Sequence, residues 1–189
     1  MGYESLRILA SRIAFLIIVP FSVSYQFTNQ ITYKYDDGNN DYIYSAESLA
    51  NLSGKKYHSK RNHITNFKKN NPDWCFEEIS KDNIDECINL HTNWIEERDD
   101  NDSDYSLEFE SVLTGFENYE KLGFYGGIIR VNGKAIAYTY GEKLNDECFV
   151  SHFEKAPADV QGAYAIINQD FLIKVSSILI EKKIWDLRD

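Results

Sequence analysis

Apolar residues recur with helical spacing in two central segments of the chain. From Ile84 to Ile95, and again from Phe109 to Tyr119, they fall three and four residues apart, the pattern of an amphipathic helix that buries one face. The sequence therefore predicts two helices in succession. His91 lies on the apolar stripe of the first, where a hydrogen-bonded core histidine is a better interpretation than a catalytic one.

Two shorter helices and a strand are predicted ahead of this pair. Ser45 is a good helix cap and Gly54 a good helix stop, which favours a short helix between them. A basic helix with one apolar stripe is predicted over Lys55 to Lys69. Trp74 to Ile79 then has the aromatic content and the length of a strand.

Beyond Phe124 the period of the apolar residues changes from helical spacing to two. Strands are predicted over Phe124 to Val131, Lys134 to Leu144 and Cys148 to Glu154. The first two are joined by Asn132-Gly133, a pair that tolerates the positive φ angles of a type I′ hairpin turn. The three segments therefore predict an antiparallel meander.

A last helix is predicted to start at Gly162, which completes the order strand, helix, helix, three strands, helix. This order predicts an α+β fold of three layers, with helices on both faces of a mixed, largely antiparallel central sheet. The 43% apolar and 14% aromatic residues are enough to fill such a core.

The N-terminal region carries a different pattern. Ile13 to Val23 is an apolar run of eleven residues, too short to span a bilayer. It fits a buried strand or helix, or the apolar part of a secretory leader that is cleaved after Ser22-Val23-Ser24. We expect a cytoplasmic protein without a stable membrane span; a membrane-associated or secreted protein is the alternative. An acidic turn at Asp36–Asp41 separates this region from the rest.

The charge of the chain is negative overall but positive in one stretch. Thirty acidic and twenty basic residues give a net charge of −10, which argues against a general nucleic-acid coat and against DNA as a partner. No acid occurs between Glu47 and Asp73, a region with six basic residues within fifteen positions. This segment predicts a site for an anionic ligand; the alternative is a solvated face. Three Cys residues without a C-x-x-C pair indicate reduced thiols rather than a disulfide framework or a zinc site.

Candidate functional residues come from this basic stretch and from the last strand. Strict alternation on that strand places Val150, His152 and Glu154 on one face and Phe149, Ser151 and Phe153 on the other. His152 and Glu154 are the candidates for a general base, with a hydrogen-bonded structural pair as the alternative. The candidate ligand-binding residues are Lys55, Lys56, His58, Lys60, Arg61, His63 and Asn168. No metal site is predicted.

Several strings resemble one known family. They are Asp41-Tyr42-Ile43-Tyr44, Leu52-Ser53-Gly54-Lys55-Lys56-Tyr57-His58, Lys60-Arg61-Asn62-His63-Ile64, Gly126 to Lys134, Phe153-Glu154-Lys155-Ala156, Gly162-Ala163-Tyr164 and Ile167-Asn168. Over Asp41 to Ile173 the chain resembles the family of unknown function that is named for the C-terminal domain of phosphatidylglycerol lysyltransferase, a bacterial branch of the GNAT-type acyltransferases.

The resemblance implies a GNAT-like acyl-CoA N-acyltransferase fold and an acyl- or aminoacyl-transferase activity. It implies acyl-CoA or aminoacyl-tRNA as the donor, so that an anionic small molecule or a tRNA would be a partner. It also implies that the backbone of Gly162 and Ala163 binds phosphate, although Asp159 replaces the Arg or Gln expected three residues before that glycine. A catalytically silent module that binds an anionic ligand, or a gene remnant, is the alternative.

The resemblance divides the chain into three parts. Residues 1–40 would be a leader or the remnant of a first domain, residues 41–175 the GNAT-like domain, and residues 176–189 a tail outside the family pattern. Read one frame away, the tail Ile178 to Asp189 can encode nearly the family's next motif, so we expect a frameshifted or truncated member without the last strands. The unpaired edge of the last strand would then favour self-association.

Overall fold

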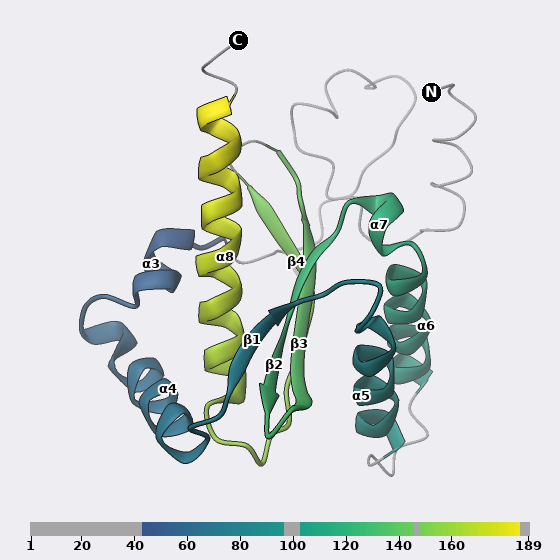
Figure 1. The fold of residues 1–189 in the computed structure, drawn as a ribbon, viewed down its shortest axis with the longest axis horizontal. Helices are drawn as coiled ribbons and strands as arrows, with labels where there is room; N and C mark the ends of the chain where they lie inside the picture. Colours follow the sequence, from purple (N-terminus) through teal and green to yellow (C-terminus); the bar gives the residue numbers. More distant parts are fainter. Residues whose placement is uncertain (1–42, 97–102, 146–147, 186–189) are drawn as a thin grey trace. The chain divides into compact units, whose positions relative to one another are not determined.

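The computed structural model describes residues 43–96, 103–145 and 148–185, which belong to one compact unit from Ile43 onward. Its elements are α3 (Ala46–Asn51), η3 (Lys55–Tyr57), α4 (His58–Asn70), β1 (Cys75–Glu78), α5 (Ile84–Glu96), α6 (Ser103–Glu117), α7 (Tyr119–Leu122), β2 (Tyr125–Val131), β3 (Lys134–Lys143), β4 (Phe149–Lys155) and α8 (Ala163–Trp185) (Figure 1). The apolar run at Ile13–Val23 and the leader prediction lie outside the described residues.

The four described strands form one antiparallel sheet in the order β1-β2-β3-β4. The α+β class and the meander are therefore confirmed, while the parallel pairing expected of a mixed sheet does not occur among the described strands. Asn132 and Gly133 have φ angles of 51° and 73°, so the hairpin turn has the two positive φ angles that its sequence predicts.

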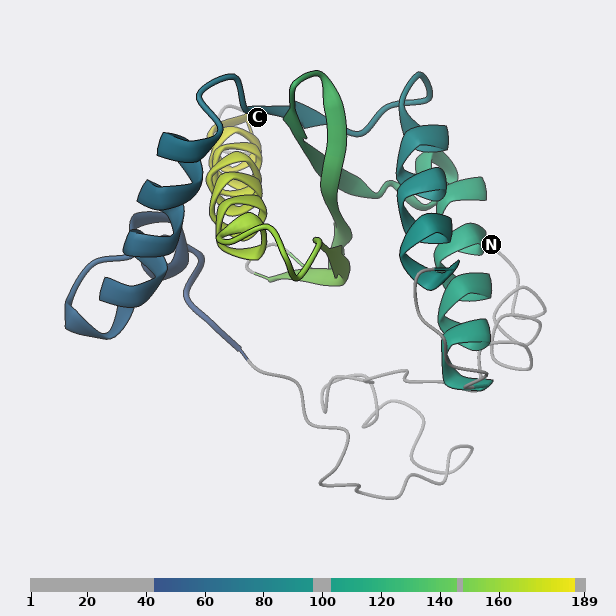
Figure 2. The same ribbon diagram turned by 90° about the horizontal axis from the view of Figure 1, so that it is seen from below.

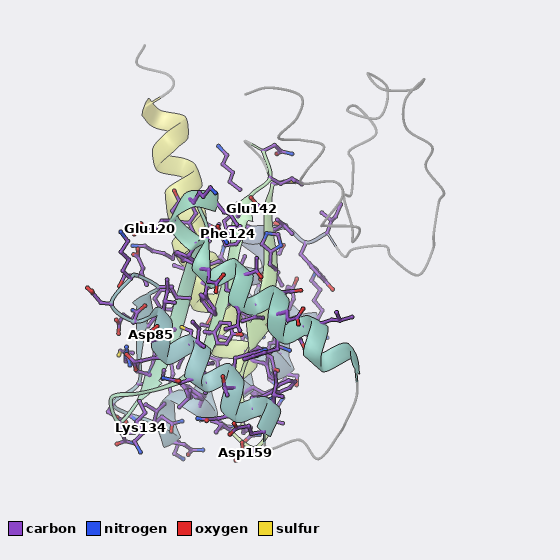
Figure 3. The ribbon with its side chains drawn as sticks, turned by 90° about the vertical axis from the view of Figure 1, so that its right-hand side faces the viewer. Asp85, Glu120, Phe124, Lys134, Glu142 and Asp159 are labelled. Carbon is purple, nitrogen blue, oxygen red and sulfur yellow. The ribbon has the colours of Figure 1, made fainter. Side chains whose placement is uncertain are left out.

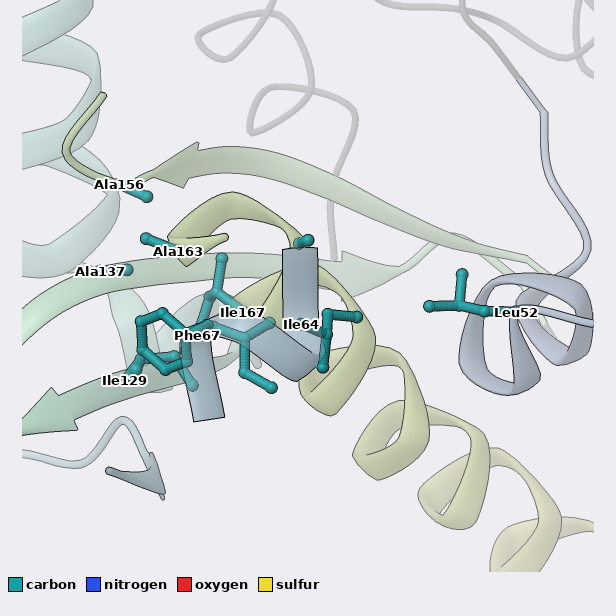
Figure 4. Packing of buried hydrophobic residues seen from close by; sticks show 10 residues of the cluster. Leu52, Ile64, Phe67, Ile129, Ala137, Ala156, Ala163 and Ile167 are labelled. Carbon is teal, nitrogen blue, oxygen red and sulfur yellow. The ribbon is translucent and has the colours of Figure 1, made fainter. Parts of the chain in front are cut away.

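Helices cover both faces of the sheet, as Figure 2 shows. The α8 face is the one against which α8 packs, with α4 on the far side of that helix; the α5–α6 face carries α5 and α6. On the α8 face, Phe67 of α4 and Ile166 and Ile167 of α8 are fully buried against Ile129 and Ala137 (Figure 4). The sheet therefore separates two apolar cores.

Aromatic rings dominate the core on the α5–α6 face. Tyr138 and Tyr140 are fully buried side by side, and Phe116 of α6 packs against both. Each tyrosine hydroxyl has a partner: Tyr138 bonds His91 Nδ1 at 2.9 Å, and Tyr140 donates to the Val112 carbonyl at 3.3 Å. His91 is thus a hydrogen-bonded core residue, as its place on the apolar stripe predicts.

Helix α8 continues beyond the predicted domain end at residue 175 and runs without interruption to Trp185. Its buried side chains recur from Ala163 to Val175. Among the described residues, no helix combines the length and apolar character that crossing a bilayer requires.

Candidate functional site

Three of the predicted site residues come together between β4, α8 and α4. Asn168 of α8 donates its side-chain N–H to Glu154 of β4 at 3.0 Å, and its side-chain carbonyl accepts from the Lys60 ammonium of α4 at 3.3 Å. The amide of Asn168 therefore bridges an acid and a base that lie 94 residues apart in sequence (154 − 60). This Lys60–Asn168–Glu154 chain is the candidate site.

Glu154 lies in an environment that favours its neutral form. Burial beside α8 raises the pKa of its carboxyl above the ordinary 4.5, while the hydrogen bond from Asn168 and the charge of Lys60 oppose this rise. One carboxylate oxygen accepts from Asn168. A carboxylate with a raised pKa is a better proton acceptor near neutral pH than an ordinary surface glutamate.

His152 does not join Glu154, which corrects the prediction that both share one face of the strand. Two neighbouring residues of β3, Tyr140 and Gly141, pair with Phe153 and Ser151, so His152 is an extra residue in β4. Such a β-bulge interrupts the alternation of side chains. Glu154 consequently lies on the α8 face and His152 on the α5–α6 face.

His152 is exposed and contacts the side chains of two neighbouring residues. Its Nε2 lies 2.9 Å from Glu142 Oε1, and its ring lies 5.2 Å from the ring of Phe124. Figure 3 shows Phe124 and Glu142 close together at the end of the sheet opposite Lys134 and Asp159. His152 therefore cannot share a proton with Glu154 across the sheet.

Arg61 has a structural role that the sequence does not reveal. Its Nη1 donates to the carbonyl oxygen of Leu52 and, at 2.8 Å, to that of Gly54. Leu52 is buried with a φ angle of 49°, so this cation holds a loop that turns sharply between α3 and η3. The Nη1 of Arg61 is therefore engaged inside the fold, and binding of an anion by Arg61 stays a prediction.

The other predicted ligand residues of this stretch divide by exposure. Lys55, Lys56 and His58 are exposed, and His63 is half-buried. Lys56 lies over the Tyr57 ring at 4.7 Å, and His58 Nε2 lies 3.2 Å from the side-chain nitrogen of Asn62. Within the part of the chain that the structure describes, none of the five lysines of this stretch forms an ion pair, and four of them are exposed: Lys55, Lys56, Lys68 and Lys69. We call these four the basic surface.

Gly162 and Ala163, the predicted phosphate-binding residues, are closely packed at the start of α8. Ala163 is fully buried, and its N–H donates to the Val160 carbonyl at 3.1 Å. Gly162 has a φ angle of 89°, and a Cβ there would lie 2.5 Å from the His63 carbonyl oxygen of α4. The Ala163 N–H is therefore already bonded inside the fold, and the close approach of two helices explains Gly162. Phosphate binding by this backbone stays a prediction.

Sequence reasoning missed two features near the candidate site. Burial raises the pKa of Asp170, which lies on α8 near Lys68, whose charge opposes the shift. Thr139 is fully buried opposite Glu154, where its hydroxyl donates to the Phe153 carbonyl at 2.9 Å. Neither residue stands in a motif, and only the three-dimensional pairing of β3 with β4 identifies Thr139.

A second charged cluster lies on the α5–α6 face at the end of β4. Lys155 forms an ion pair with Glu108, and its ammonium lies 4.4 Å from the centre of the Trp94 ring. The ring of His91 stacks between Trp94 and Phe109 at centroid distances of 6.0 and 5.8 Å. The consecutive residues Glu154 and Lys155 thus belong to polar clusters on opposite faces of the sheet.

Other chemistry is less well supported. In the described ranges, no group of three His, Cys, Asp or Glu side chains gathers in a way that could hold a metal ion. Burial raises the pKa of Cys87 to about 12, so its thiol stays protonated and is a poor nucleophile. Proton transfer at Glu154 is therefore the reaction that these residues support best.

Comparisons with known proteins bear on the family to which the chain belongs. Residues 17–176 match the family described as phosphatidylglycerol lysyltransferase, C-terminal, and the match begins ahead of Asp41, where the resemblance of the motifs starts. A crystal structure of a conserved protein of unknown function from Bacteroides thetaiotaomicron is 32% identical with a TM-score of 0.71. The alignment covers 91% of this chain and 62% of that protein, so the chain spans less than two thirds of its length. Comparison with curated proteins gives no match. The chain belongs to the family of the phosphatidylglycerol lysyltransferase C-terminal domain.

Proposed function

We propose that the described unit is a GNAT-like domain that transfers an acyl or aminoacyl group to an amine or a hydroxyl. The observation that carries the proposal is the Lys60–Asn168–Glu154 chain, in which a partly buried carboxylate with a raised pKa is held by an amide and a cation. Membership of the lysyltransferase family favours an aminoacyl donor over other reactive esters.

Glu154 would act as the general base of this reaction. As the acceptor nitrogen or oxygen forms a bond to the donor carbonyl carbon, its proton passes to the Glu154 carboxylate. The bond between that carbon and the leaving group then breaks, and the leaving group takes up a proton. Asn168 keeps one carboxylate oxygen in place, and Lys60 keeps the amide of Asn168 from rotating.

The basic surface would bind the anionic part of the donor. Its four lysines are exposed and make no ion pair among the described residues, so their charge is available to phosphate groups. Lys60 and Arg61 are left out of this role because each already holds a partner inside the fold.

Activity assays with the purified chain test the proposal. Acetyl-CoA, another acyl-CoA and charged tRNA are offered as donors with amine and hydroxyl acceptors, and transfer is followed by mass spectrometry. We expect Glu154→Gln to abolish transfer while keeping donor affinity, because the amide keeps the shape but cannot accept the proton. Glu120→Gln is the control, because Glu120 lies on the surface in a pair with Lys81, and this variant should retain transfer.

A non-catalytic module that binds an anionic ligand is the second candidate. The engagement of the Ala163 N–H favours it, because the expected phosphate cradle ahead of α8 is already used by the fold. If the unaltered chain binds charged tRNA or acyl-CoA without turnover under all conditions, this candidate replaces the transferase. If reversal of Lys55, Lys56, Lys68 and Lys69 to Glu leaves that affinity unchanged, the basic surface is only a solvated face.

A further inference from the structure

The direction in which Glu154 points depends on a single extra residue in β4. Side chains on the strand first alternate regularly. The ring centroids of Phe149 and of Phe171 in α8 lie 5.5 Å apart, and the Ser151 hydroxyl forms a hydrogen bond with the Thr139 hydroxyl on the same face. Continued alternation would place Phe153 and Lys155 on the α8 face and Glu154 on the other. The opposite is observed. The ring centroids of Phe153 and Tyr140 lie 5.4 Å apart and the Lys155 ammonium lies over the Trp94 ring, so both side chains are on the α5–α6 face.

The bulge at His152 accounts for this reversal. Phe153 pairs with Tyr140 and His152 has no partner in the register of β3, yet both side chains face the α5–α6 side. From Phe153 onward the alternation resumes one residue out of step, which brings Glu154 opposite Thr139 and beside Asn168. A bulge is a common way to redirect a side chain next to a functional site.

Three residues hold the bulge in place: Thr139 and Gly141 of β3, and the ring of His152 itself. Thr139 reaches across it, because its hydroxyl contacts the Ser151 hydroxyl at 3.2 Å and donates to the Phe153 carbonyl at 2.9 Å. Gly141 allows the close approach of β4, since a Cβ there would collide with the Val150 carbonyl oxygen. The His152 ring is braced by Glu142 and Phe124. These contacts come from both faces of the sheet.

We propose that Thr139, Gly141 and His152 are positioning residues that maintain the bulge and thereby hold the Glu154 carboxylate beside Asn168 and Lys60. The proposal rests on the role of Glu154 stated above. It assigns His152 a part in the site that differs from proton transfer, since its side chain never approaches the reacting groups. Thr139 acts in the same indirect way, through the carbonyl of Phe153.

The pKa of Glu154 measures the position of its carboxylate independently of any activity. Burial is the main cause of its rise, so a carboxylate that leaves its place gains water and titrates at lower pH. Loss of the Asn168 bond alone has the opposite effect, because that hydrogen bond lowers the pKa. The direction of the shift therefore separates displacement of the carboxylate from loss of one partner.

The experiment is a pH titration of the full chain labelled with ¹³C at glutamate carboxyl carbons, with the Glu154 signal assigned through Glu154→Gln. We expect Thr139→Val and His152→Ala to lower the pKa of Glu154 toward the ordinary value. Thr139→Ser keeps the hydroxyl and should retain the pKa of the unaltered chain. Asn168→Leu should raise it.

Tyr140→Phe is the matched control for general destabilisation. It removes a buried hydroxyl with a partner from the strand position next to Thr139, on the other face, and should leave the Glu154 titration unchanged. Should Thr139→Val not fold, the exposed His152 decides the outcome through His152→Ala. An unchanged Glu154 titration in the folded variants, or an equal shift in Tyr140→Phe, would overturn the proposal. If the variants show the expected pKa shifts but the unaltered chain has no transferase activity, the transferase function is contradicted and the positioning role is still supported.

Discussion

At the scale of single residues, Glu154 is expected to reduce the stability of the fold at neutral pH. Its pKa is raised in the folded state, so the unfolded chain binds fewer protons between the ordinary 4.5 and the raised value. Stability attributable to this group is therefore lost as the pH rises through that window. We predict that Glu154→Gln is at least as stable as the unaltered chain at pH 7 and that the difference disappears in acid. Urea unfolding at several pH values checks this.

His91 should produce the opposite dependence. Burial and the nearby Lys155 lower its pKa below the ordinary 6.5, while Glu108 opposes the shift. The folded chain then holds His91 neutral where the unfolded chain is protonated, so this contribution is present above pH 6.5 and is lost as the pH falls through the folded pKa. His91→Gln should flatten the acid limb of a plot of stability against pH. An unchanged acid limb would show that another group titrates there.

Residue patterns anticipate these two positions to different degrees. The apolar stripe of α5 identifies His91 as a core residue, because burial follows helical periodicity. Alternation along β4 finds the correct residue types but assigns Glu154 to the wrong face, since a bulge leaves no trace in the pattern of apolar and polar letters. The sequence indicates Asn168 and Lys60 as candidate ligand residues but gives no sign that they contact each other or Glu154.

At the scale of elements, the junction of α4 and α8 is expected to depend on Gly162. Alanine there would combine a strained positive φ with a collision against the His63 carbonyl oxygen. We predict a loss of about 2 kcal/mol or more for Gly162→Ala. Gly133→Ala is the control: its φ is 73°, but its Cβ would meet nothing within 4 Å, so only strain of about 1 kcal/mol applies. Thermal unfolding measures both variants, and an equal loss of stability in Gly162→Ala and Gly133→Ala would contradict the packing explanation.

An arginine joins three elements on the other side of the sheet. Arg130 of β2 binds Glu86 of α5 through two hydrogen bonds of 2.6 and 2.8 Å and also contacts Glu77 of β1. Both glutamates are more than 40% exposed, so water screens the pair. We predict that Arg130→Met costs about 1–2 kcal/mol and that Glu86→Gln costs less. Denaturant midpoints measure both losses of stability. An unchanged midpoint in Arg130→Met would show that the ion pairs add nothing to the stability of the fold.

Element boundaries follow the sequence closely where local signals are strong. Asn132-Gly133 gives the hairpin, and the helical stripes give α5 and α6. Helix α8 extends past residue 175, the predicted end of the domain, because the residues that follow contain no Gly or Pro and continue the helix to Trp185.

At the scale of the whole molecule, the sheet is expected to be most stable in its middle. Strands β2 and β3 are paired on both sides and lie between the two apolar cores, whereas β1 has four residues and only one strand partner among the described residues. We predict slow amide hydrogen exchange in Ile128, Ile129 and Tyr138 and faster exchange in β1 and on the outer side of β4. Uniform exchange across the sheet would contradict this order.

The unpartnered side of β4 also bears on the expectation of self-association. In the described part of the chain, β4 pairs with β3 alone, which leaves one row of backbone groups available for another strand. The bulge works against such pairing because it twists the strand. Self-association through this edge stays a prediction, and sedimentation of the full chain over a concentration series tests it.

The extra residue in β4 also restricts how the chain can change in length. An insertion in the turn between Lys143 and Phe149 leaves the strand beyond it unaffected. An insertion just before Glu154, or removal of His152, would exchange the sides of two neighbouring charges. Lys155 would then point toward Lys60, and Glu154 would point toward Glu108, so that two attractive pairs would become two repulsive ones. A change of one codon in this short stretch is therefore opposed by electrostatics on both sides of the sheet at once.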